Sequence, residues 1–198
     1  MARLEFFYDY GSPYSYLANG RLPELAARTG AQLIYRPMLL GGVFKATGNR
    51  SPAAETIEAK RRYGAVELSR WVAHLGVPFR MNPHFPIDTL RLMRAAHAAH
   101  AQGVFAAFHA AVYPAFWALG ENLGDEAVVA RVLGEAGLDA GAILAAASAD
   151  AAKTALRATT DEAVARGAFG APTFFVGDEM FFGNDRLDFV ERALRAAR

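Results

Sequence analysis

An aromatic, apolar run over residues 4–10 stops at Gly11, and Ser12-Pro13 then opens an apolar-periodic segment. This order predicts a buried strand that turns directly into a helix. The Ser12 hydroxyl would then lie beside the unpaired N–H groups and the positive dipole end of that helix, where anions are stabilised. Thiol-redox proteins hold a reactive cysteine at such a place, because the same field stabilises a thiolate. This chain has a serine there and no cysteine anywhere, so any thiol used at the site must come from outside.

The two ends of the chain predict strands combined with helices. Residues 31–37 alternate like a second strand after a helix over 13–29, which gives a β-α-β unit with a right-handed crossover and parallel strands. Residues 172–183 predict two short strands joined by a tight turn, and residues 186–197 predict a final amphipathic helix. Joined together, these ends make the thioredoxin arrangement, β-α-β followed by β-β-α.

The middle of the chain predicts helices almost throughout. After a glycine-rich connection over 41–52, apolar periodicity and alanine runs indicate helices at about 53–75, 88–101, 103–118, 124–136, 139–148 and 150–167. We therefore expect an α/β, thioredoxin-like fold with a large all-helical insertion. In this prediction, residues 1–52 and 169–198 form a discontinuous thioredoxin-like domain, and residues 53–168 form the inserted helical domain.

The composition excludes several functional classes. With 53% hydrophobic and 21% charged residues the chain is an ordinary globular protein, and a net charge of +1 gives no case for binding nucleic acid or an anionic membrane. The lack of cysteine excludes disulfides, thiolate metal sites and an internal CxxC redox cycle. No apolar run reaches roughly 18 residues, and the N-terminus has no signal-peptide pattern. We therefore expect a cytoplasmic protein without a membrane span.

Three separated blocks carry a resemblance to a known family. They read FYDYGSPYSYLA over 7–18, TGN over 47–49, and FGAPT continuing to FFGNDR over 169–186. On these blocks the chain resembles 2-hydroxychromene-2-carboxylate isomerases, which are relatives of kappa-class glutathione transferases within the DsbA-like thioredoxin superfamily. The resemblance spans nearly the whole chain and implies a cytoplasmic homodimer that uses reduced glutathione, acts on a small aromatic substrate and needs no metal.

Ser12 has two interpretations. It is a good N-cap with Pro13 at the first helical position, which is a structural role only. The resemblance instead makes Ser12 the catalytic residue, because the active serine of the family immediately precedes this proline and would donate a hydrogen bond to the glutathione sulfur. A free thiol has a pKa of about 8.5, so this bond would raise the thiolate fraction at neutral pH. No histidine stands at a spacing that would activate the serine, which argues against a hydrolase triad.

The Ala171-Pro172 pair also has two interpretations. A proline is common at the start of an edge strand, and only about 5–6% of X-Pro bonds are cis in general. In thioredoxin-like proteins, a cis proline at this place exposes the backbone amide and carbonyl of the preceding residue to the peptide of glutathione. The resemblance therefore implies a cis bond and a backbone contact from Ala171.

The stretch after the last predicted strand is expected to bind the γ-glutamyl end of glutathione. Its sequence is equally typical of a plain turn and helix cap. By the resemblance, Phe182 and Gly183 contact this end of glutathione, Asn184 holds its carboxylate, and Asp185 accepts from its ammonium group. Arg186 is expected to be a structural ion-pair partner and lies outside the predicted site.

Residues leading into the helical block complete the expected site. Asn49 follows a glycine and is most simply a turn residue, and Lys60 is most simply a solvated residue on a helix. The resemblance gives both a part in binding glutathione, with Lys60 as the cation for its glycyl carboxylate. Lys45 is a further candidate for that contact. The five histidines show no metal-ligand spacing with acidic partners, so no metal site is expected.

Together with the resemblance, these residues predict an enzyme. The expected reaction interconverts 2-hydroxychromene-2-carboxylate and trans-o-hydroxybenzylidenepyruvate, a step in naphthalene-type aromatic degradation, by reversible addition of a glutathione thiolate. The alternatives are a kappa-class-like glutathione transferase or peroxidase on another electrophile, and a non-catalytic DsbA-like binding module. Large aromatic residues are usually part of the core. Six of them could instead line a pocket for the aromatic substrate: Phe44, Tyr63, Trp71, Phe85, Phe116 and Trp117.

Overall fold

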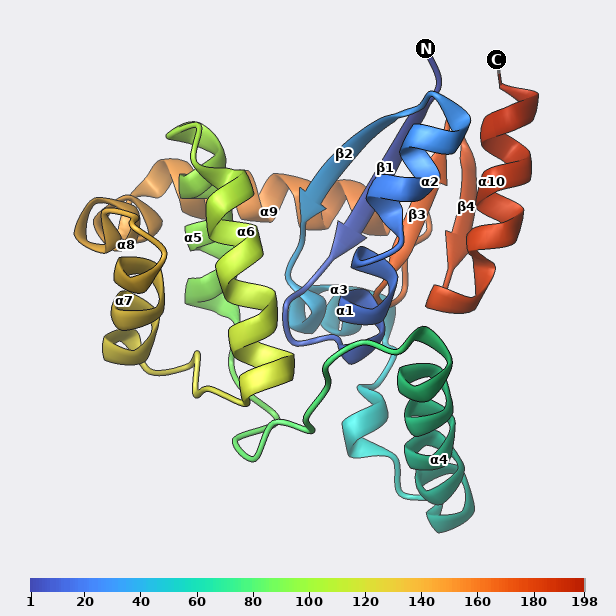
Figure 1. The fold of residues 1–198 in the computed structure, drawn as a ribbon, viewed down its shortest axis with the longest axis horizontal. Coiled ribbons are helices and arrows are strands. Elements are labelled where there is room, and N and C mark those ends of the chain that lie inside the picture. The colour runs from blue at the N-terminus through green and yellow to red at the C-terminus, as the bar shows by residue number, and fades with distance from the viewer. Residues whose placement is uncertain (198) are drawn as a thin grey trace.

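The computed structural model describes residues 1–197, which form a four-stranded mixed sheet surrounded by helices (Figure 1). The strands are β1 (Arg3–Tyr8), β2 (Gln32–Pro37), β3 (Thr173–Val176) and β4 (Glu179–Phe182), in the sheet order β2-β1-β3-β4. Strand β1 pairs with β2 in parallel and with β3 in antiparallel orientation, and β3 pairs with β4 in antiparallel orientation. This topology confirms the predicted β-α-β and β-β-α units at the two ends of the chain.

Ten α-helices accompany the sheet within residues 1–197. They are α1 (Pro13–Asn19), α2 (Leu22–Thr29), α3 (Leu40–Thr47), α4 (Glu58–Leu75), α5 (Leu90–Ala101), α6 (Phe105–Pro114), α7 (Glu126–Glu135), α8 (Ala140–Ser148), α9 (Asp150–Ala165) and α10 (Leu187–Ala196). A π-helical turn, Ala115–Leu119, extends α6, and short 3-10 turns lie at Pro52–Ala54 and Asn184–Arg186. The predicted helices of the middle block are present with ends shifted by a few residues. None of the helices described is both long and apolar enough to cross a bilayer.

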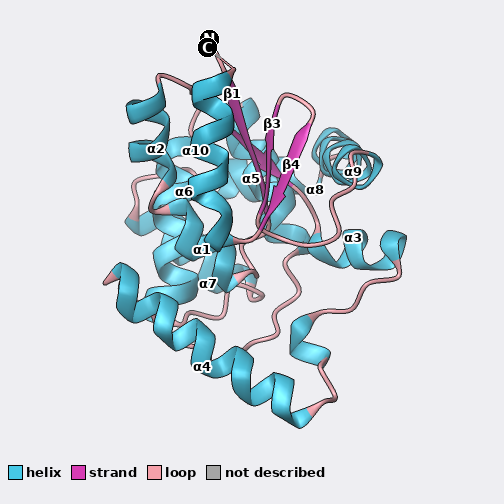
Figure 2. Ribbon diagram, turned by 90° about the vertical axis from the view of Figure 1, so that its right-hand side faces the viewer, coloured by secondary structure: helices cyan, strands magenta, loops and turns pink. Residues whose placement is uncertain are grey.

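Alternate residues of β1 serve two separate cores, as the two-residue period of a strand requires. Leu4, Phe6 and Tyr8 belong to the larger core, which also holds residues of α2 and α10. Phe7 belongs to the smaller core, which includes residues of α3 and α9. Figure 2 shows α2 and α10 on one side of the strands and α3 and α9 on the other. The sheet is therefore covered on both faces.

The larger core is continuous between the predicted thioredoxin-like part and the helical block. Trp117 is fully buried, and its indole Nε1–H donates to the backbone carbonyl of Tyr10 at 2.7 Å. Tyr10 in turn packs edge-on against Tyr113 of α6, with 4.6 Å between ring centroids. These contacts join the two parts at Tyr10, just after β1. The division into domains at residues 52 and 168 stays a prediction.

The segment after β2 differs from the prediction, because helix α3 occupies much of the expected glycine-rich connection. The Asp9 carboxylate accepts from the Leu40 amide at 2.8 Å and so satisfies a free N–H at the start of α3. Gly42 lies where an added Cβ would come within 3.1 Å of Thr160 on α9, so a glycine lets the two helices approach closely. Partners far away in the sequence thus outweigh the low helix propensity of Gly41 and Gly42.

Helix α4 stands apart from the rest of the fold. Figure 1 shows it projecting below the sheet, with its N-terminal end farthest from the strands, and Figure 2 shows it along the lower edge of the molecule. None of its 18 residues is buried, although α5, with 12 residues, buries six. Its closest neighbour in the fold is α1, which carries Ser12 at its start.

Candidate active site

The turn between β1 and α1 fixes Ser12 as the N-cap of α1. Ser12 has extended backbone angles, and its Oγ accepts a hydrogen bond from the Ser15 amide at 3.1 Å. Its own amide donates to the carbonyl of Asp9 at 3.0 Å, which closes the turn. Pro13 follows at the first helical position, where its missing N–H is not needed. The capping role of Ser12 is therefore present in the structure.

Asp9 also belongs to this turn, and the sequence analysis did not identify it. It is only 1% exposed and accepts from the amides of Gly11 (2.9 Å) and Leu40 (2.8 Å) and from the Thr89 hydroxyl (3.0 Å). Burial raises the pKa of Asp9, and these three hydrogen bonds oppose the rise. Because its donors come from the turn, the start of α3 and the start of α5, Asp9 holds three segments around Ser12.

The Ala171-Pro172 bond is cis, as predicted, and its loop lies against Ser12. The Ser12 hydroxyl donates to the Ala171 carbonyl at 3.1 Å. The Pro172 carbonyl accepts from the Gly183 amide at 3.0 Å, which brings the end of β4 to the same place. Within residues 1–197 the Ala171 amide has no hydrogen-bond partner. One backbone donor next to Ser12 therefore remains free to bind a ligand.

The turn after β4 places Asn184 and Asp185 beside this loop. Asn184 is 3% exposed, its backbone carbonyl accepts from Arg21 at 3.1 Å, and its side-chain Nδ2 has no partner in the described part of the chain. Asp185 is exposed and forms an ion pair with Arg186 at 3.0 Å, so Arg186 is an ion-pair partner as expected. A buried amide donor and an exposed carboxylate thus lie on successive residues.

Tyr14 is a second residue near the site that the sequence analysis did not single out. It is half-buried, and burial raises its pKa to about 12, with further contributions from Glu67, Tyr63 and Asp185. Helix α1, which carries Tyr14, contacts both α4 and the turn that carries Asp185. Only the position of Tyr14 two residues after Ser12 on a helix could have indicated this, because the partners are far away in the sequence.

Asn49 and Lys60 have different surroundings. The Asn49 side chain donates to the Phe169 carbonyl at 2.8 Å, and its Oδ1 accepts from the Arg50 amide at 2.8 Å, so it ties the segment after α3 to the loop before Ala171. Lys60 is exposed on α4, and no contact joins it to the Ser12 turn within the described residues. It lies seven residues before Glu67, hence on the same helix face but about 10 Å farther along the axis.

Phe182 covers the loop that contains the cis proline. Its ring lies 4.4 Å from that of Phe169, and an added Cβ on Gly170 would come within 2.8 Å of the Phe182 ring. Both phenylalanines are partly exposed. The structure therefore gathers these predicted site residues around one loop: Ser12, Asn49, Ala171, Pro172, Phe182, Gly183, Asn184 and Asp185.

The six aromatic residues considered for a substrate pocket lie in different surroundings, and Phe44 of α3 is half-buried. Phe116 and Trp117 are fully buried in the larger core, and Phe85 packs against Trp117 with 5.7 Å between centroids. Tyr63 and Trp71 belong to α4 and are at least partly exposed. Histidine and carboxylate side chains form no cluster of three that would suit a metal ion in the described part of the chain.

Comparisons with known proteins agree with this fold. Residues 3–195 match the family described as the DSBA-like thioredoxin domain. The 2-hydroxychromene-2-carboxylate isomerase of Sphingobium xenophagum is 36% identical over 191 residues, which cover 96% of this chain and 97% of that protein. Glutathione S-transferase kappa 1 of Homo sapiens is 27% identical over 210 residues, covering 96% and 90% of the two chains. A solved 2-hydroxychromene-2-carboxylate isomerase structure matches with a TM-score of 0.86 at 33% identity, covering 98% of this chain and 95% of that one.

Proposed function

The chain belongs to the 2-hydroxychromene-2-carboxylate isomerase family within the DSBA-like thioredoxin domains, and from this premise we propose that it is a glutathione-dependent isomerase. Its substrate pair would be 2-hydroxychromene-2-carboxylate and trans-o-hydroxybenzylidenepyruvate, as in the naphthalene-type degradation of aromatic compounds. The observation that carries the proposal is the contact between the Ser12 hydroxyl and the backbone of Ala171, beside an amide without a partner in residues 1–197.

The donors and acceptors around Ser12 fit reduced glutathione. The free amide and the carbonyl of Ala171 suit the backbone of the cysteinyl residue. The buried Asn184 Nδ2, unpaired within the described residues, suits the γ-glutamyl carboxylate, and the exposed Asp185 carboxylate suits the ammonium group. Phe182 and Gly183 border these groups, and Asn49 holds the loop in place through Phe169.

Ser12 would act by changing its hydrogen-bond partner. A hydroxyl has one proton to donate, and in this structure it goes to the Ala171 carbonyl. When a ligand amide donates to that carbonyl, the Ser12 proton can turn to a sulfur held next to it. The Ser15 amide continues to donate to Ser12 Oγ and keeps the hydroxyl in position.

When bound, glutathione would supply a thiolate nucleophile for reversible addition to the substrate. The protein stabilises that thiolate and orients the glutathione. The Ser12 hydroxyl stabilises the thiolate, and the fixed donors of Ala171 and Asn184 orient the glutathione. From α4, Lys60 would add a cation for the glycyl carboxylate of glutathione.

The homodimer and the cytoplasmic location expected from the resemblance stay predictions.

The Ser12→Ala variant tests the proposal. We expect conversion of 2-hydroxychromene-2-carboxylate, followed by ultraviolet absorbance, to require glutathione and to fall roughly 100-fold in Ser12→Ala, as for the loss of one preorganised donor. The matched control is Ser15→Ala, which removes a buried hydroxyl of the same helix that lies beside the Tyr113 hydroxyl and not beside the Ala171 carbonyl. Full glutathione-dependent activity in Ser12→Ala would exclude the proposed role of Ser12.

A kappa-class-like transferase is the second candidate, favoured by the near full-length similarity to glutathione S-transferase kappa 1. Titration of free thiol during turnover separates the two reactions. An isomerase leaves the amount of glutathione unchanged, whereas a transferase consumes it in proportion to product. Consumption of glutathione would keep the glutathione site and replace the isomerase by the transferase. No turnover with either class of substrate would leave the DsbA-like binding module.

A further inference from the structure

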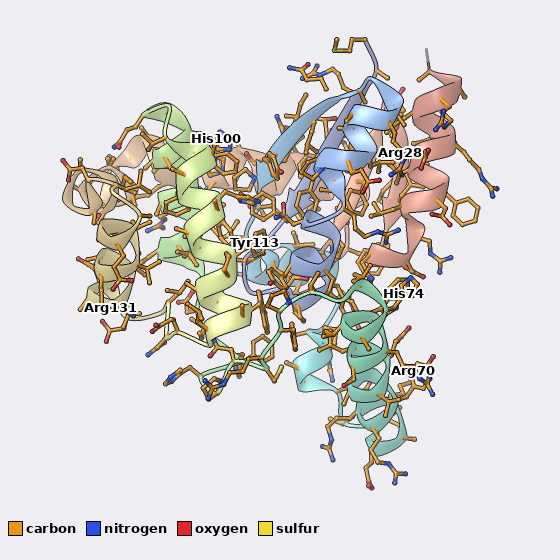
Figure 3. All side chains as sticks on the ribbon, viewed as in Figure 1. Arg28, Arg70, His74, His100, Tyr113 and Arg131 are labelled. Atoms are coloured by element: carbon orange, nitrogen blue, oxygen red, sulfur yellow. The ribbon has the colours of Figure 1, made fainter. Side chains whose placement is uncertain are left out.

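A cavity of about 380 Å³ lies between α1, β2 and α6, apart from the residues assigned to glutathione. Figure 3 labels Tyr113 on α6, in the space between this helix and α1. We call this cavity the α1–α6 cavity. Its principal lining residues are Tyr16, Asn19, Tyr35, Phe105, His109 and Tyr113. Its volume falls in the range of small-molecule sites, about 300–1,000 Å³.

The α1–α6 cavity opens on the other side of α1 from the glutathione site. Tyr14 lies toward α4 and Asp185, whereas Tyr16 lines the cavity and donates from its hydroxyl to the Pro78 carbonyl at 2.7 Å. Residues two apart on a helix point about 200° apart. A ligand in the cavity would therefore not contact the groups proposed to hold glutathione.

The walls of the α1–α6 cavity are aromatic rings from different elements. Tyr35 of β2 lies 5.3 Å from Phe105 and 4.6 Å from His109, measured between ring centroids. His109 lies 4.9 Å from Tyr113, edge to face. Such surfaces bind another aromatic ring by stacking and edge contacts in addition to the burial of apolar area.

His109 is held as a neutral ring by hydrogen bonds at both nitrogens. The Tyr8 hydroxyl donates to the Tyr10 hydroxyl, so Tyr10 donates to His109 Nδ1 at 2.8 Å. His109 Nε2–H then donates to Asn19 Oδ1 at 2.8 Å. Burial lowers the pKa of His109 to about 3, so the ring stays uncharged at neutral pH. None of the twelve residues that line the cavity carries a charge, and a charged ligand would lose hydration there without a partner.

Besides the fully buried Tyr113 hydroxyl, two polar groups at the wall keep hydrogen-bonding capacity. The Tyr35 hydroxyl has no partner among residues 1–197, and the Asn19 side-chain NH₂ has none there either. Both residues are only partly exposed. An oxygen atom on an aromatic ligand could accept from the Asn19 amide or exchange a hydrogen bond with the Tyr35 hydroxyl.

We propose that the α1–α6 cavity is a second binding site, and that it takes an uncharged aromatic molecule of about two fused rings that carries one oxygen. The aromatic walls supply most of the contact, and Asn19 and Tyr35 select for the oxygen. The lack of a charged lining residue distinguishes this ligand from the carboxylate-bearing substrate proposed for the Ser12 site. The inference does not depend on the reaction at Ser12.

Two probes of equal size and different charge test the proposal. We expect 1-naphthol to bind the intact protein saturably with one site per chain, followed by its fluorescence, and 1-naphthoate to bind at least tenfold more weakly. The substitution Ala110→Phe places a ring in the cavity and should weaken naphthol binding at least tenfold. Its matched control is Ala107→Phe, an exposed position of the same helix that does not line the cavity, where binding should be unchanged.

Four results would overturn the inference. The first three are equal affinity for the two probes, equal effects of Ala110→Phe and Ala107→Phe, and displacement of naphthol by saturating glutathione, which would place the probe at the Ser12 site. A change in sedimentation caused by Ala110→Phe without naphthol binding to the parent protein would also overturn it, since the cavity would then be part of a contact between chains. Thermal unfolding of each variant shows whether a loss of binding comes from loss of the fold.

Discussion

The two sides of α1 differ in the charge of the groups that they offer to a ligand. On the Ser12 side, the Ala171 amide and the Asn184 side-chain amide have no partner in residues 1–197, and Asp185 is exposed to solvent. On the other side, both ring nitrogens of His109 are hydrogen-bonded and the ring is neutral. The groups left without a partner there in residues 1–197, the Tyr35 hydroxyl and the Asn19 side-chain NH₂, are uncharged. A buried donor without a partner costs about 1–3 kcal/mol of stability, and a bound ligand that accepts from this donor recovers part of that free energy. One side is thus suited to a charged, peptide-like ligand and the other to an uncharged ring.

Among the variants that test this comparison, we expect Gly183→Ala to cause the largest loss of stability and of glutathione binding. Gly183 has φ 107° and ψ 148°, a conformation that is essentially restricted to glycine, and an added Cβ would lie 2.5 Å from Asp185 Oδ1. We expect the free energy of unfolding, measured by urea denaturation, to fall by about 3 kcal/mol. Glutathione binding should be lost as well, because the turn positions Asn184 and Asp185.

Gly177→Ala is the matched control for this variant. Gly177 also has a positive φ of 58° and lies in the turn between β3 and β4, but an added Cβ would meet nothing within 4 Å. We expect a loss of only about 1 kcal/mol there, with glutathione binding retained. Equal losses of stability and binding in the two variants would mean that the Gly183 turn has no special part in the site.

The neutral state of His109 sharpens the comparison through pH. Its folded-state pKa of about 3 lies below the value of about 6.5 in an unfolded chain, so the unfolded state binds more protons between these values. The contribution of His109 to stability is therefore complete above pH 6.5 and is lost as the pH falls. From this residue alone we expect a slope of at most about 1.4 kcal/mol per pH unit below pH 6.

Comparison with two variants isolates that slope. His109→Gln keeps a donor and an acceptor but cannot titrate, so its stability should fall less steeply with decreasing pH than that of the parent protein. His74→Gln, at an exposed position of α4, should leave the slope unchanged. His97 and His100, whose pKa values burial also lowers, are present in all three proteins and cancel in the comparison. Parallel curves for the parent and His109→Gln would mean that His109 is not held neutral.

The sequence predicts the features of this site that are encoded by neighbouring residues. Ser12-Pro13 after an apolar strand is sufficient to predict the N-cap, and the alternation over residues 172–183 is sufficient for the β3-β4 hairpin. Only the family resemblance predicted the cis bond and the presence of Asn49 and Asn184 at the same site. No local sequence pattern distinguishes these residues from ordinary turn residues.

The remaining features depend on partners that lie far apart in the chain. Helix α3 starts where Asp9 accepts from Leu40, 31 residues later, and no propensity of residues 41–52 indicates this. The neutral His109 likewise requires Tyr10, 99 residues away, together with Asn19. Periodicity predicts that such residues are buried, but it does not predict which buried polar group meets which.

The smallest effect concerns Lys60, the cation of α4 proposed for the glycyl carboxylate of glutathione. Because Lys60 is exposed on α4, its attraction to the glycyl carboxylate is screened by water, and we expect a contribution of at most about 1 kcal/mol. Lys60→Ala should raise the KM for glutathione up to about fivefold and leave kcat unchanged, as for a contact equally strong in substrate and transition state. The increase should shrink when salt is added.

Arg62→Ala decides whether that effect belongs to a site or to the general charge of α4. The substitution Arg62→Ala removes the same charge two residues away, about 200° around the helix, from a side chain that lies 3.8 Å from Glu58. If Lys60 contacts the ligand, only Lys60→Ala raises the KM. If both variants raise it equally, α4 contributes only a diffuse positive field, and the charged groups of glutathione are recognised by Asn184 and Asp185 alone. The distance of the N-terminal end of α4 from the strands makes this the most exacting test of the predicted site (Figure 1).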